Sequence, residues 1–165
     1  MYSKLKLFGH PIHPMVVAYP NAFYTSTLVA FLLYAFTADG FWVRVAIAAN
    51  VAGVVMAVVA AVPGFIDWLV GIPSGTRAKR TGLIHLSLNV AALVVFAITM
   101  FAYLGRWNDP EGATAALGIV LALIGVGLTV AAGFQGWKLI QDHHVGVKLS
   151  PDQERMEPGR AERAA

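Results

Sequence analysis

Four long apolar stretches constrain this chain more than any other feature of its sequence. They run roughly over residues 15–36, 41–69, 82–104 and 113–140. A helix needs about 20 apolar residues to cross the hydrocarbon core of a bilayer, so each stretch is long enough for one crossing. Of the 165 residues, 58% are hydrophobic and only 13% are charged. Soluble domains carry about twice that charged fraction, and we therefore predict an integral membrane protein in contact with a lipid bilayer.

The links between these stretches predict the topology. They cover residues 38–40, 71–80 and 105–112, and such short links make neighbouring helices antiparallel. The predicted fold class is all-α, an up-and-down four-helix bundle over residues 15–141. Residues 1–14 form an N-terminal segment before it, and residues 142–165 form a polar C-terminal segment after it. Neither strand alternation nor an internal repeat stands out in the sequence.

The basic residues predict the orientation of the bundle. An even number of crossings puts both termini on one side of the membrane. That side holds Lys4, Lys6, Arg77, Lys79, Arg80, Lys138, Lys148, Arg155, Arg160 and Arg163, and the other side holds only Arg44 and Arg106. Because basic loops stay in the cytoplasm, we expect both termini to be cytoplasmic. The net charge of +3 is spread along loop ends, so nucleic acid is not an expected partner.

All five histidines fall on the predicted cytoplasmic side. His10 and His13 precede the first crossing, and His85 is expected in the first turn of the third. His143 and His144 follow the fourth crossing. Each residue alone also has a simpler interpretation, as an interfacial or solvated side chain. Together they place ionisable groups from several helices in one layer, which predicts a site.

Asp67 adds a carboxylate to the same layer. It lies in an otherwise apolar run near the cytoplasmic end of the second crossing. An ionisable side chain within a membrane span is costly and usually has a functional partner, such as a histidine or a bound cation. The alternative is an ion pair with Arg77 or Lys79. The chain has no cysteine, which excludes thiolate metal ligands and cysteine nucleophiles.

Several of these residues lie in motifs that resemble the bacterial DUF2231 family of predicted transmembrane proteins. The motifs are GHPIHPM at 9–15, GFIDW at 64–68, PSGTRAKRTG at 73–82 followed by His85, GWKLIQDH at 136–143 and VGV at 145–147. Family members have glycine where this chain has His144, which favours His143 as the site residue. The resemblance implies a four-helix membrane domain and supplies no activity. Some members are joined to Rieske-type iron–sulfur domains, which points to electron transfer.

We favour a redox site as the first hypothesis. Two neutral imidazoles on facing helices can bind a haem iron axially. His13 and His85 belong to the first and third helices, which are diagonal in such a bundle, and would hold a b-type haem between them. His85 and His143 form an alternative pair. The protein would then transfer electrons between this haem and a quinone or an iron–sulfur partner.

Two other hypotheses stay open. The first is a non-haem site for zinc, iron, manganese or copper, with ligands from His10, His13, Asp67, His85 and His143. The second is a non-catalytic accessory subunit in which this layer of histidines and Asp67 links the helices as a polar latch. Homo-oligomerisation is compatible with each hypothesis, and the sequence leaves open whether the protein is an enzyme.

Overall fold

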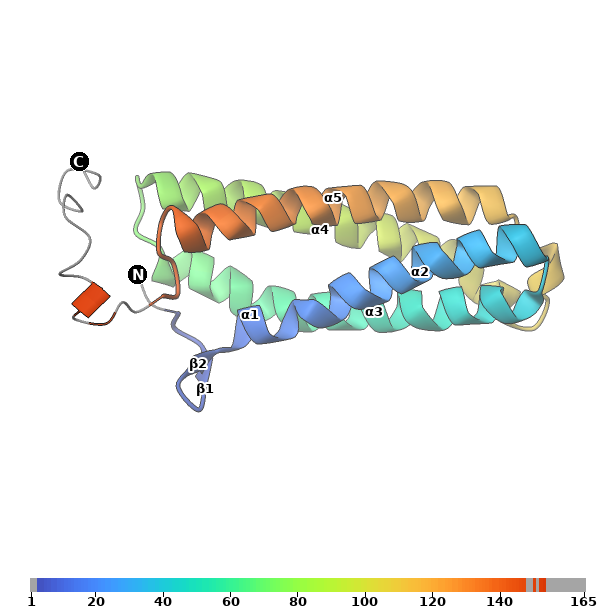
Figure 1. The fold of residues 1–165 in the computed structure, drawn as a ribbon, viewed down its shortest axis with the longest axis horizontal. Helices are drawn as coiled ribbons and strands as arrows, with labels where there is room; N and C mark the ends of the chain where they lie inside the picture. Colours follow the sequence, from blue (N-terminus) through green and yellow to red (C-terminus); the bar gives the residue numbers. More distant parts are fainter. Residues whose placement is uncertain (1–2, 148–149, 151, 154–165) are drawn as a thin grey trace.

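The structure is a computed structural model that describes residues 3–147, 150 and 152–153. Four long helical crossings lie side by side as an antiparallel bundle (Figure 1). They consist of α1 (Ile12–Val16) with α2 (Ala18–Thr37), α3 (Gly40–Ile66) with the π-helix η1 (Asp67–Gly71), α4 (Arg77–Tyr103) with the 3-10 helix η2 (Leu104–Trp107), and α5 (Ala115–Gln141), which follows η3 (Pro110–Gly112). The predicted all-α four-helix bundle is confirmed.

The outer surface of the bundle is the surface of a membrane protein. All four crossings are long and apolar enough to span a bilayer. Large apolar side chains point outward along every helix, as Val29, Val58, Val94 and Leu123 illustrate, each about half exposed. Soluble monomers rarely expose so much contiguous apolar surface. The protein is therefore an integral membrane protein with four crossings.

Prolines and caps shift the helix boundaries away from the predicted ones. The first crossing begins at Ile12 and is interrupted at Val17, three residues before Pro20, which has no N–H to donate to the preceding turn. The third crossing begins at Arg77, because the side chain of Thr76 accepts a hydrogen bond from the backbone N–H of Lys79 at 3.2 Å. His85 therefore lies about two turns into α4, and its expected position in the first turn is wrong.

Pairs of aromatic rings join the diagonal helices α2 and α4 through the centre of the bundle. Tyr24 stacks on Phe96 with ring centroids 3.6 Å apart and an interplanar angle of 6°. Phe31 lies against Tyr103 at 4.6 Å. In both pairs the two residues are 72 positions apart in the sequence.

Glycines on the other two helices follow the same spacing. A Cβ atom on Gly53 of α3 would lie 2.7 Å from the Tyr24 ring. A Cβ atom on Gly125 of α5, which is 72 positions later, would overlap the ring of Phe96 in the same way. Small residues of this kind let membrane helices approach each other closely.

The bundle is thus built from two similar helical hairpins, α2–α3 and α4–α5, related by an approximate two-fold axis along its length. The fully buried Thr27 and Thr99 repeat at the same spacing, and each donates a hydrogen bond to a carbonyl four residues earlier. The sequence analysis missed this internal repeat. The repeat is clearest at the contacts inside the bundle, because lipid-facing positions only need to be apolar.

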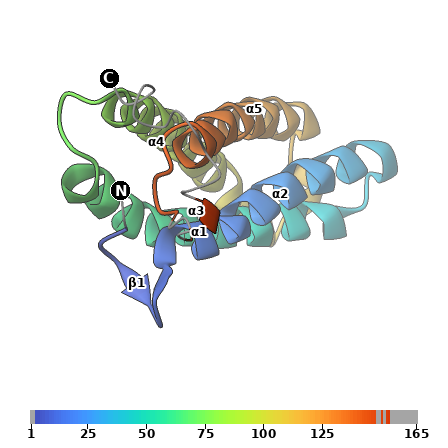
Figure 2. The same cartoon turned by 60° about the vertical axis from the view of Figure 1, so that its left-hand side comes forward.

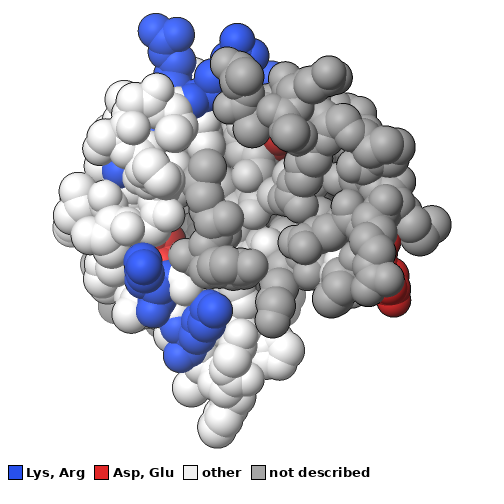
Figure 3. Space-filling view, turned by 90° about the vertical axis from the view of Figure 1, so that its left-hand side faces the viewer, with Lys and Arg blue, Asp and Glu red and all other residues white. Residues whose placement is uncertain are grey.

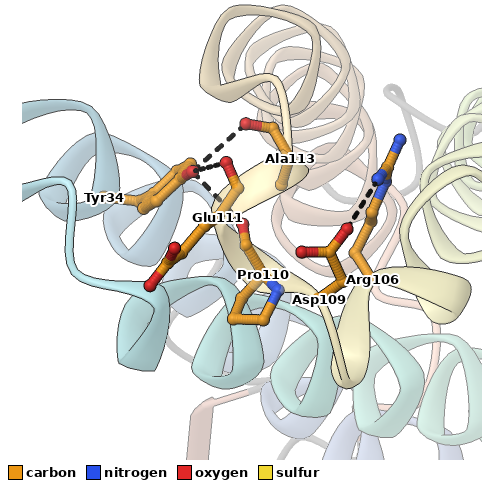
Figure 4. Close-up of polar contacts among 6 residues, drawn as sticks. All are labelled: Tyr34, Arg106, Asp109, Pro110, Glu111 and Ala113. Atoms are coloured by element: carbon orange, nitrogen blue, oxygen red, sulfur yellow. Dashed lines mark hydrogen bonds and ion pairs between the residues drawn. The ribbon is translucent and has the colours of Figure 1, made fainter.

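The connection 104–114 closes the end of the bundle opposite α1, and polar contacts hold it there (Figure 4). The hydroxyl of Tyr34 lies 3.2–3.3 Å from the backbone carbonyls of Pro110, Glu111 and Ala113 and can donate to them. Arg106 and Asp109 form an exposed ion pair at 3.4 Å in the same loop. These contacts hold the 104–114 connection over the ends of α2 and α3.

Replacing Gly125 tests whether the central ring contacts stabilise the bundle. Gly125→Ala places a methyl group against Phe96, and overpacking of this kind costs about 1–3 kcal/mol. We expect a lower thermal unfolding midpoint in detergent micelles. Gly127→Ala is the matched control, because a Cβ there would meet nothing within 4 Å. Equal destabilisation by both substitutions would contradict the role of the close contact.

Candidate functional site

His13 of α1 and His85 of α4 face each other across the two-fold axis. Their ring centroids are 6.1 Å apart and their planes are perpendicular, at 90°. The Nδ1 atom of His13 lies 2.9 Å from the carbonyl oxygen of Ala60, and that of His85 lies 2.8 Å from the carbonyl oxygen of Ala132. Both hydrogen bonds span 47 residues, and the two histidines are again 72 positions apart.

These hydrogen bonds determine which nitrogen of each imidazole carries the proton. A carbonyl oxygen can only accept, so Nδ1 must be the donor in both His13 and His85. In the neutral ring the lone pair is then on Nε2, the nitrogen left to bind a metal or a donor. The backbone of α3 and α5 therefore presents two imidazoles in the same tautomer.

Glycines let the histidine rings lie directly on the neighbouring helices. A Cβ atom on Gly64 would lie 2.6 Å from Nδ1 of His13, and one on Gly136 would lie 3.1 Å from Cε1 of His85. Gly64 and Gly136 are also 72 positions apart. Each half of the chain thus contributes the same unit, a histidine ring held between a carbonyl and a glycine of the next helix.

A cavity of about 380 Å³ surrounds the two rings. Small and apolar residues of all four helices form most of its wall, including Ala57, Gly133 and Leu93. Tyr24 also lines it, and the Tyr24 hydroxyl is buried without a hydrogen-bond partner among the described residues. A cavity of this size and character is typical of a binding site for a largely apolar molecule.

Asn89 is the polar neighbour of His85 within this cavity. Its side-chain nitrogen lies 3.2 Å from Nε2 of His85 and 2.9 Å from the backbone oxygen of the same residue. The amide therefore has a second acceptor available when Nε2 is engaged elsewhere.

Asp67 binds the N-terminal segment. Its carboxylate accepts hydrogen bonds from Oγ of Ser3 and the backbone N–H of Lys4, both at 2.6 Å, and from the N–H of Leu5 at 3.4 Å. Lys79, considered from the sequence as its ion-pair partner, instead donates to backbone carbonyls at the end of the second crossing and lies 4.4 Å from the centre of the Trp68 ring. Asp67 thus fixes the segment beside the mouth of the cavity, which both Ser3 and Asp67 line.

The remaining histidines have other surroundings. His10 is exposed in the strand β2 (His10–Pro11), and Nε2 of His143 lies 3.2 Å from the hydroxyl of Thr81. His144 adopts a left-handed conformation with φ 50° at the end of α5. Glycine is favoured in that conformation, which explains the glycine expected there in related chains.

The structure brings together His13 and His85 from the five ligands considered for a metal. Within the described ranges, no group of three or more His, Cys, Asp or Glu side chains is arranged to hold a metal ion. The sequence analysis did not identify Ala60 and Ala132 as hydrogen-bond partners of the two histidines. The signal was present in the 72-residue spacing of Ile-His at 12–13 and 84–85.

The fold and this pair define a class of protein, a four-span membrane bundle with two histidines facing each other inside it. The model of the family described as predicted membrane protein (DUF2231) matches residues 9–149, and the chain belongs to this family. Comparisons with curated proteins and with solved structures find no match.

Removing the charge of Asp67 tests its role as the anchor of the N-terminal segment. Hydrogen bonds to a charged group contribute about 1.5–3 kcal/mol, so Asp67→Asn should expose the segment roughly ten-fold or more often. We expect faster tryptic cleavage after Lys4 and Lys6, measured by mass spectrometry of the protein in detergent. Asp109→Asn, at the other end of the bundle, is the control. Unchanged cleavage in Asp67→Asn would show that other contacts hold the segment.

Proposed function

We propose that the protein binds a b-type haem between His13 and His85 and transfers electrons through it. The observation that carries the proposal is the pair of imidazoles, each hydrogen-bonded at Nδ1 and separated by 6.1 Å between centroids. Imidazole nitrogen bonds transition metals at about 2.0–2.1 Å, so two rings on opposite sides of one ion have centroids about 6 Å apart. His13 and His85 would hold the haem between them through their Nε2 atoms, for which this separation leaves room.

The number of ligands favours haem over a bare metal ion. A site made only of protein side chains normally needs three or four ligands. A porphyrin supplies four nitrogens itself and needs the protein only for the axial positions. Two facing histidines, with no third ligand grouped beside them in the described part of the chain, therefore suit haem better than zinc or another non-haem metal.

The walls of the cavity suit a flat apolar group. Gly64 and Ala57 of α3, together with Gly136 and Gly133 of α5, keep side-chain volume away from the space around the histidine pair. Cofactor sites in helical bundles are built in this way, with side chains from facing helices projecting inward. Bound haem would supply one-electron redox chemistry, with its potential set by the axial histidines and the polarity around them.

The protein's own residues orient the ligands and control access. The carbonyls of Ala60 and Ala132 hold both imidazoles in one tautomer, with Nε2 free of the backbone. Asn89 would keep its hydrogen bond to the His85 carbonyl while Nε2 is engaged. The cavity lies near one end of the bundle, where Ser3 and Asp67 line it, so an iron–sulfur protein at the surface or a quinone from the bilayer is the proposed electron partner.

Purified protein tests the haem proposal. Expression with haem available should give a Soret band that shifts on reduction with dithionite. His13→Ala and His85→Ala should each lose most of the bound haem, because each removes an axial ligand. His144→Ala is the matched control and should retain it, because His144 lies in the turn after α5.

Other outcomes would support the other hypotheses. A colourless protein with stoichiometric zinc, iron, manganese or copper would overturn haem in favour of a non-haem site. A colourless, metal-free protein that stays folded after chelation would favour a non-catalytic accessory subunit.

The distribution of basic residues supports an orientation in the bacterial inner membrane with the histidine end facing the cytoplasm. Figure 3 looks onto this end and shows Lys and Arg side chains at its top and at its lower left. Those near it include Lys4, Lys6, Arg77 and Arg80, and basic residues are favoured on the cytoplasmic side.

Reporter fusions test this orientation. Alkaline phosphatase, which is active only in the periplasm, should be inactive when fused after Ala165. Inserted in the loop after Trp107 it should be active, because that loop lies at the other end of the bundle. The reverse pattern would invert the proposed topology.

A further inference from the structure

The N-terminal segment forms a β-hairpin with an unusual turn. Strand β1 (Lys6–Leu7) pairs antiparallel with β2 (His10–Pro11), and Leu7 lies opposite His10. Phe8 and Gly9 alone make the turn, with φ values of 49° and 84°. Two-residue turns with both φ angles positive strongly prefer asparagine, aspartate and glycine, so a phenylalanine at the first position is strained.

Packing against the described part of the chain does not offset this strain. Phe8 is 93% exposed and its neighbour Leu7 is 51% exposed. A strained residue persists where its position serves a purpose, and a large apolar side chain gains nothing from exposure to water. The exposure of Phe8 therefore points to a partner outside the described structure.

The direction in which the hairpin leaves the bundle indicates what surrounds its tip, Phe8 and Gly9. Figures 1 and 2 show that the hairpin leaves the bundle sideways, across the direction of the helices, at the end where α1 begins. Ile12, the first residue of the first crossing, directly follows β2. The tip therefore extends over the lipid beside the bundle, at the level where the crossing enters the membrane.

The base of the hairpin is held firmly and carries positive charge. Asp67 binds the segment at Ser3, Lys4 and Leu5, and the N–H of Ile12 donates to the carbonyl of Leu5 at 3.2 Å. The side chains of Lys4 and Lys6 are exposed. Aromatic and apolar groups beside lysines are the combination that binds a membrane interface containing anionic lipids.

We propose that the hairpin is an interfacial anchor. Phe8 and Leu7 insert at the boundary between headgroups and acyl chains, and the lysines contact anionic headgroups. His13 lies five residues after Phe8, so the anchor sets the depth of the first crossing and of the ring that it carries. This inference stands on the hairpin alone and does not depend on haem binding.

Site-directed spin labelling tests the anchor, and the absence of cysteine from the chain makes it direct. A nitroxide on Leu7→Cys leaves Phe8 in place, and the protein is reconstituted in vesicles of equal parts phosphatidylcholine and phosphatidylglycerol. Ser74→Cys is the control, because Ser74 is exposed in the loop before α4 at the same end of the bundle. We expect the ratio of oxygen to nickel-chelate accessibility to be several-fold higher at position 7 than at position 74.

A second substitution separates the apolar tip from the fold of the hairpin. Phe8→Gly suits the positive φ and removes the aromatic ring, so the hairpin is retained while the label at position 7 should become more accessible to the nickel chelate. Vesicles of phosphatidylcholine alone should lower the accessibility ratio as well. A water-like ratio at position 7 with Phe8 present, or a label shielded from both reagents by a second copy of the chain, would overturn the proposal.

Discussion

The contact of aromatic rings from the two diagonal helices across the bundle axis is the constraint on which the rest of the structure depends. In a bilayer the hydrophobic effect does not drive helices together, so packing and hydrogen bonds decide their arrangement. Here the rings of Tyr24 and Phe96 stack at 3.6 Å because Gly53 and Gly125 leave room for them. That contact aligns the two helical hairpins of the chain around one axis.

The site follows from the same geometry. Where the axis reaches the end of the bundle near the N-terminal hairpin, the paired residues are His13 and His85 in place of aromatic carbocycles. Their Nδ1 atoms are satisfied by backbone carbonyls, which is the low-cost way to keep a polar ring inside a membrane. The two halves differ at other positions, and some polar residues, such as Asp67 in the first half and Asn89 in the second, have an apolar counterpart. Asp67, which has Leu139 as its counterpart, fastens the N-terminal segment beside the site.

The fold was largely predictable from the sequence, and the site was predictable only in part. Long apolar runs and short links predict four antiparallel crossings because a bilayer imposes their length. His13 and His85 were identified as candidates from their position at one end of the bundle. The hydrogen bonds of Asp67 with Ser3 and Lys4 were not, because they join residues more than sixty positions apart and leave no local pattern. The depth of His85 was misjudged because the cap at Thr76 starts α4 earlier than hydropathy indicates.

The sequence by itself determined that this chain crosses a membrane four times, that its histidines gather toward one end, and that cysteine chemistry is absent. The length of an apolar run and the type of each residue are local properties, so they are visible in the sequence without knowledge of the contacts between segments. Only the tertiary structure decided that His13 faces His85, which carbonyl each ring binds, and that the two halves repeat at a spacing of 72 residues. Those relations depend on how the four helices are arranged around the bundle axis, and close packing at buried glycines determines that arrangement.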